Sequence, residues 1–193
     1  MTAGVVAALL LAAACTSGGS RSSGQTTGST AAPAAPATPA LQIQLVATAK
    51  VPPGGLSAKQ AARRAAPGLE RFLDRYLHAA FVDAAGGEAG WNGLLGLFDT
   101  PVRASARKQL DALSLGAAAP NVTAVRPGRA SARAVVLYGG QRAEAATVRV
   151  AFDATADTAK GSGQVHLRSV LQLLATRDGW RIAGFDSRTG PPQ

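Results

Sequence analysis

The chain has 193 residues and a formal net charge of +9 at pH 7, with 20 Lys and Arg against 11 Asp and Glu. A single cysteine excludes an intramolecular disulfide and a thiolate metal site, and two widely separated histidines disfavour a histidine metal site. The sequence has no Gly-rich phosphate loop and no nucleophile elbow, so we expect no cofactor and no metal. A balance this basic favours polyanions, but we interpret most of it as a solvated surface.

The first residues form a short apolar segment, MTAGVVAALLLAAA (residues 1–14), which carries no charge. A helix of about twelve residues rises roughly 18 Å, too little to cross a hydrocarbon core of about 30 Å. A short apolar run followed by small residues and a polar tract is typical of a secretion signal. We therefore predict that residues 1–14 are a signal peptide.

The stretch LAAACTSGGS, in which Cys15 follows three alanines, resembles the lipobox of bacterial lipoproteins. The resemblance implies that the sulfur of Cys15 is acylated and that Cys15 becomes the mature N-terminus. The protein would then be anchored by lipid to the outer face of the cytoplasmic membrane, where no nucleic acid partner is expected. The alternative is a plain secretion signal with an unmodified Cys15.

The segment after Cys15, residues 16–40, consists almost entirely of Ser, Gly, Thr, Ala and Pro, with Arg21 as its only charge. Such a composition buries too little apolar surface to offset its conformational entropy. We predict that residues 15–40 are a lipidated cysteine with a disordered tether, reaching on the order of 25 to 40 Å.

Residues 41–188 are predicted to form a single domain, and residues 189–193 a tail. The domain opens with LQIQLV (41–46), whose alternation of apolar residues and glutamine is typical of a half-buried strand. This strand could extend the edge of a sheet or lie against a partner. The sequence VPPGG (51–55) ends it.

Three helical segments are predicted next. SAKQ (57–60) has the spacing of a capping box, so the first helix begins at Ser57, and Pro67 with Gly68 should kink or divide it. A second apolar face spans 91–98. In DTPV, Thr100 is the expected N-cap of a third helix, with Pro101 at its first position, and this helix should end at Gly116.

From residue 121 onward the pattern changes to that of strands, which we predict at 122–125, 130–138, 142–153, 164–176 and 180–186. A polar loop is expected up to Gly163, and the dipeptide Asp178-Gly179 favours a tight hairpin between the last two strands. Helices followed by a meander predict an α+β fold, in which N-terminal helices pack on a curved antiparallel sheet.

The helical stretch FLDRYLHAAFVD and the closing hairpin LLATRDGWRIAGFD together resemble the nuclear transport factor 2-like cone, over about residues 57–188. Ketosteroid isomerases, polyketide cyclases (the SnoaL-like group) and many exported actinobacterial proteins share this cone. The chain is also similar to proteins associated with mammalian-cell-entry (Mce) transporters. The resemblance implies a fold and a compartment more than an activity, and it allows a homodimer formed through the open sheet.

Enzymes with such a cone place acid and base groups in an apolar pocket, where burial shifts their pKa values. The pocket candidates here are Tyr76, Asp83 and His166. Tyr76 lies on the apolar helix face, Asp83 should end its helix, and alternation directs His166 toward solvent. We interpret Asp74 and His78 as an exposed ion pair.

Two functions from different classes follow. The leading hypothesis is a non-enzymatic, lipid-anchored accessory module of the cell envelope that binds an envelope protein or an apolar ligand. The alternative is a small isomerase, cyclase or hydratase acting in the cone pocket. In a weaker interpretation, exposed helical arginines at 64, 71 and 75 and at 103 and 107 contact lipid headgroups or wall polymers.

Overall fold

The computed structural model describes residues 40–86 and 88–190. The predicted signal peptide, Cys15 and the tether up to residue 39 lie outside the described residues. Within the described ranges, no helix combines the length and the apolar character needed to cross a membrane.

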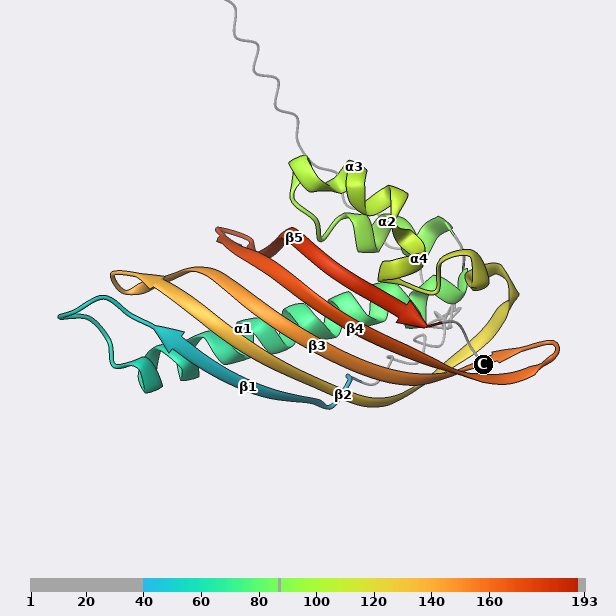
Figure 1. Ribbon diagram of the computed structural model, residues 1–193, viewed down its shortest axis with the longest axis horizontal. Coiled ribbons are helices and arrows are strands. Elements are labelled where there is room, and N and C mark those ends of the chain that lie inside the picture. The colour runs from blue at the N-terminus through green and yellow to red at the C-terminus, as the bar shows by residue number, and fades with distance from the viewer. Residues whose placement is uncertain (1–39, 87, 191–193) are drawn as a thin grey trace, which may run out of the picture. The chain divides into compact units, whose positions relative to one another are not determined.

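The domain is built on a five-stranded sheet in the order β1-β2-β3-β4-β5 (Figure 1). Its strands are β1 (Ile43–Lys50), β2 (Val122–Gly139), β3 (Arg142–Thr158), β4 (Gly161–Thr176) and β5 (Gly179–Gly190). Strands β2 to β5 form the predicted antiparallel meander. Strand β1 pairs with β2 in parallel, so the sheet is mixed rather than purely antiparallel. The first predicted strand therefore extends the sheet edge.

The central strands are longer than the sequence indicates. Strands β3 and β4 continue to Thr158 and Gly161, so most of the predicted polar loop between them is strand. Strand β2 is continuous where two strands were predicted. A register shift between Pro127 and Ala130 accommodates the proline, which has no N–H to donate. Strand β5 includes the first two residues of the predicted tail, up to Gly190.

Helix α1 (Ala58–Leu77) begins at the predicted capping box. The Gln60 amide N–H donates to Ser57 Oγ at 3.3 Å, and the Ser57 amide donates to Gln60 Oε1 at 3.2 Å. The predicted division at Pro67 does not occur, because α1 continues through the proline as one helix. A π-helical turn, His78–Val82, and a 3-10 turn, Asp83–Gly86, follow it.

Three short helices follow: α2 (Glu88–Leu95), α3 (Thr100–Lys108) and α4 (Leu110–Leu113). The predicted cap was wrong by one residue, because the carboxylate of Asp99, rather than Thr100, accepts from the first amide of α3 at 3.0 Å. The predicted third helix is also interrupted at Gln109 and ends before Gly116, which adopts a positive φ of 49°.

The core lies between the helices and one face of the sheet. Side chains of α1, including Leu69, Phe72 and Leu73, are fully buried against alternate residues of the strands, such as Val148 and Leu171. Helices α2 to α4 gather near β5, while α1 runs along the strands on one side of the sheet (Figure 1). The predicted α+β architecture with helices packed on a sheet is confirmed. No described element covers the opposite face of the sheet, which we call the open face.

Candidate functional site

The open face carries cross-strand rows of side chains, because strand residues alternate between the two faces. Register fixes the neighbours within each row. Arg133 of β2 lies directly opposite Arg149 of β3, and Arg168 of β4 lies directly opposite Arg188 of β5. Arg149 also pairs with Val170, two residues beyond Arg168 on β4. Two pairs of facing arginines therefore occupy adjacent rows of one surface.

These four arginines line a hollow of about 610 Å³ that crosses the middle of the sheet, which we call the arginine groove. The groove is open to solvent and contains one acidic residue, Asp186. Its outward-facing lining consists of Gln44, Val46, Ser131, Arg133, Arg149, Ala151, Arg168, Val170, Asp186 and Arg188. Four cationic side chains therefore surround a space large enough for a small ligand.

Most of the groove arginines have no acidic partner. Within residues 40–86 and 88–190, no carboxylate oxygen lies within 4.0 Å of the guanidinium nitrogens of Arg133, Arg149 or Arg188. Arg168 is the exception, with Nη1 at 3.1 Å from Asp153 Oδ1. Like charges placed directly opposite each other destabilise a sheet, and guanidinium groups bind phosphate and carboxylate groups in a bidentate geometry. An anion in the groove would relieve this repulsion.

Asp153 and His166 form a pair at the border of the groove. His166 Nδ1 lies 2.8 Å from Asp153 Oδ1, and because a carboxylate only accepts, Nδ1 carries the proton. Hydrogen bonding from His166 is the main cause that lowers the pKa of Asp153; burial partly opposes it and Arg168 adds to it. With 54% of its side chain exposed, His166 faces solvent as the alternation indicates.

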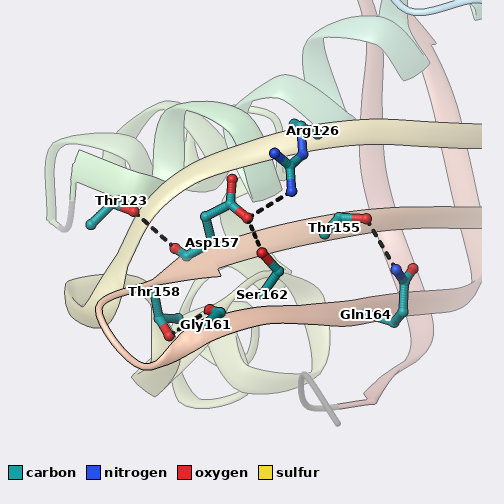
Figure 2. A network of polar contacts seen from close by, with 8 residues as sticks. All are labelled: Thr123, Arg126, Thr155, Asp157, Thr158, Gly161, Ser162 and Gln164. Carbon is teal, nitrogen blue, oxygen red and sulfur yellow. Dashed lines mark hydrogen bonds and ion pairs between the residues drawn. The ribbon is translucent and has the colours of Figure 1, made fainter.

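The open face beyond this pair, toward the β3–β4 turn, has a different character. Asp157 Oδ1 accepts from Arg126 Nη2 at 2.8 Å and from Ser162 Oγ at 2.5 Å. Gln164 Nε2 donates to Thr155 Oγ1 at 3.1 Å. Figure 2 shows these contacts bridging β2, β3 and β4. We call this region the paired hairpin end, because Asp157 and Arg126 form an ion pair there and the neighbouring Ser162, Gln164 and Thr155 side chains are hydrogen-bonded.

Tyr76 lies in the core. It is fully buried, and its hydroxyl donates to the Leu113 carbonyl at 3.5 Å. Burial raises its pKa well above the ordinary tyrosine value, while the Ser169 and Ser187 hydroxyls act in the opposite direction. Tyr76 borders neither the arginine groove nor the smaller hollow beside Thr189. Tyr76 is therefore a core residue whose buried hydroxyl is hydrogen-bonded within the fold.

The three pocket candidates do not share a site. Tyr76 is in the core, His166 is on the opposite face of the sheet, and Asp83 is exposed at the start of the 3-10 turn after α1. No cluster of three or more His, Cys, Asp or Glu residues in the described ranges could hold a metal ion. Tyr76, Asp83 and His166 therefore do not act together in one pocket of the described domain.

Asp74 and His78 are closer to the core than predicted. His78 is only 13% exposed at its side chain, and its Nδ1 lies 3.3 Å from Asp74 Oδ1 and 2.9 Å from the Asp74 carbonyl oxygen. Asp74 Oδ1 also accepts from the Leu41 amide at 2.9 Å. The pair is partly covered because Asp74 binds the backbone of Leu41, two residues before β1, and so holds the segment that leads into β1 against α1. The pair is structural rather than an exposed ion pair.

The arginine groove was not predicted from the sequence. The basic residues considered from the sequence were a different set, the helical arginines 64, 71, 75, 103 and 107. All five are exposed in the structure. The signal for the groove was the alternation in "ARAVVL", "TVRVAF" and "VHLRSV", which directs each arginine away from the buried residues. Alternation identifies the face, but only register brings Arg133 opposite Arg149.

Comparison of the chain with protein-family models, with curated proteins and with solved structures found no match.

Proposed function

We propose that this protein is a non-enzymatic, tethered binding module of the cell envelope, and that the arginine groove binds an anionic group of its ligand or partner. The proposed binding site rests on one observation: two pairs of facing arginines lie around one hollow. Arginine is suited to this role because its planar guanidinium stays charged and donates in pairs to phosphate or carboxylate oxygens.

The compartment and the fold family belong to the same proposal. The lipobox-like sequence ending at Cys15 and the tether of residues 16–40 support a lipid anchor on the outer face of the cytoplasmic membrane. A meander backed on one side by helices supports a nuclear transport factor 2-like cone. The anchor is tested by intact mass and membrane fractionation of the native protein beside Cys15→Ala. A mass that differs only by the substituted side chain, together with an unchanged membrane fraction, would contradict it.

The binding site is tested by calorimetric titration with inorganic pyrophosphate at low ionic strength. We expect the double variant Arg133→Gln/Arg149→Gln to lose at least tenfold in affinity, because charge-assisted hydrogen bonds are each worth about 1.5–3 kcal/mol. The matched control is Arg64→Gln/Arg71→Gln, which removes the same charge from the exposed side of α1. The control should stay within about twofold of the wild type, whereas weakened binding at higher salt is expected in both.

Equal losses in the two double variants would contradict the proposal. Such a result would show that pyrophosphate responds to the net charge of the whole protein rather than to the groove.

A further inference from the structure

Exposed aliphatic side chains gather on the same face as the arginine groove. In the described ranges, the large hydrophobic side chains that are exposed are Val46 (61%), Val135 (40%), Leu137 (47%) and Leu174 (43%). Register places all four in rows of the open face, since each pairs with or follows outward-facing residues. All four exposed large hydrophobic side chains of the described domain therefore lie on the face that carries the arginine groove.

The aliphatic side chains extend the groove in one direction along the strands. Val46 lines the groove and pairs with Arg133, while Val135 and Leu137 follow Arg133 at two and four residues along β2. Each two-residue step along a strand covers about 6.6 Å, so Leu137 lies roughly 13 Å from Arg133. Leu174 lies in the row of Leu137, with the small Ala145 between them on β3. We call these four residues the aliphatic strip.

Resting on the proposed function, we propose that the ligand is a single-chain anionic amphiphile, whose phosphate headgroup binds in the arginine groove while its apolar chain lies along the aliphatic strip. Charge complementarity selects the headgroup, because four guanidinium groups surround the hollow with one acidic residue among them. The strip selects the chain, because an inorganic or sugar phosphate would leave these side chains in water.

Two other occupants fit the open face less well. A second copy packed through the same face would bring two sets of like-charged arginines into one interface, where unpaired charges are costly. A flat lipid surface would contact the rims of the face but would not fill a hollow of about 610 Å³. A discrete headgroup with one chain matches both the hollow and the strip.

The test is titration of the full chain with dodecyl phosphate below its micellar concentration, with inorganic phosphate, and with neutral dodecyl maltoside. We expect dodecyl phosphate to bind at least tenfold more tightly than inorganic phosphate, because burial of a few methylene groups suffices for that factor. Dodecyl maltoside, which lacks the anionic head, should bind more weakly than dodecyl phosphate by a similar factor.

Two variants separate the head from the chain. Leu137→Thr/Leu174→Thr should lower the affinity for dodecyl phosphate several-fold toward that for inorganic phosphate, and should leave the binding of inorganic phosphate unchanged. Threonine is β-branched and therefore suits a strand, and thermal unfolding checks that the variant folds. Arg133→Gln/Arg149→Gln should weaken binding of both phosphates.

Failure of this inference is distinct from failure of the proposed function. Inorganic phosphate binding that depends on the arginines, with no gain from the dodecyl chain, would overturn the amphiphile and leave the anion groove in place. No binding of either phosphate would overturn both. Binding to vesicles of anionic phospholipid, without binding of monomeric dodecyl phosphate, would overturn the amphiphile in favour of docking on a membrane.

Discussion

The paired hairpin end and the arginine groove occupy the same face of the same strands, yet their arginines have different neighbours: an aspartate in the first and another arginine in the second. At the hairpin end, Asp157 joins Arg126 and Ser162, and the β3–β4 turn is held together by polar contacts. In the groove, Arg133 lies opposite Arg149. Arg126 is therefore neutralised within the fold, whereas Arg133 and Arg149 have no carboxylate within 4.0 Å in the described part of the chain. The contrast separates a part of the sheet that polar contacts stabilise from a part whose arginines can bind an anion.

The comparison is tested most strongly by Asp157→Asn. We expect this change to lower the free energy of unfolding by about 1 kcal/mol, because it weakens two hydrogen bonds and removes one ion pair at a side chain that is only 24% exposed. Urea unfolding measures the effect. Anion binding by the groove should not change.

Asp186→Asn is the matched control for that variant. Asp186 is exposed and has no cationic group within 4.0 Å in the described part of the chain, so its substitution should leave stability within about 0.5 kcal/mol of the wild type. Because Asp186 lines the groove, its neutralisation should strengthen pyrophosphate binding. Equal destabilisation by the two variants would remove the distinction between the two regions.

The second prediction concerns whether substitution of a groove arginine raises or lowers the free energy of unfolding. Arg149→Thr should raise the free energy of unfolding by about 0.2–1 kcal/mol, because it removes a like charge opposite Arg133 and introduces a β-branched residue. Arg126→Thr, made as its control, should lower stability because Arg126 is paired with Asp157. Both are measured by urea unfolding at low salt, where exposed charges are least screened. A loss of stability in Arg149→Thr would show that the groove arginines stabilise the sheet rather than strain it.

The sequence predicts on which face of the sheet a side chain lies better than it predicts which side chains of neighbouring strands lie opposite each other. Alternation correctly separates Arg149 and Arg168 from the buried valines and leucines beside them, and the capping box locates the start of α1. The register of two strands depends on the exact residues of the turn between them. The small and polar residues of 154–163 are typical of a loop as well as of a strand with one face in solvent. The hairpin end and the groove were therefore both missed.

Other errors have equally local causes. Asp99 and Thr100 are both good N-cap residues, and composition does not choose between them. Pro67 favours a break, but tertiary packing of the apolar face holds α1 as one helix. The environment of Asp74 could not be predicted, because the pairing of the first strand was open and Leu41, which donates to Asp74, lies at its start.

The smallest expected effect lies at the border between the two regions, where Asp153 contacts both His166 and Arg168. Its pKa is lower in the folded protein than the ordinary value of 3.8, with hydrogen bonding from His166 as the main cause. The folded state therefore holds this carboxylate ionised more strongly than the unfolded state does. The resulting stabilisation is fully present above pH 4 to 5 and is lost as the pH falls through the lowered pKa.

Unfolding measured between pH 6 and pH 3 should show this loss in the wild type and a flatter profile in Asp153→Asn, with a small amplitude because the Asp153 side chain is 33% exposed and solvent screens its interactions. Asp186→Asn, which leaves Asp153 and its two partners in place, serves again as the control. If Asp153→Asn kept the full slope, the border pair would contribute nothing to the folded state. Arg168 would then join the other three arginines as a free charge of the groove, and the boundary between the two regions would move one row toward the hairpin.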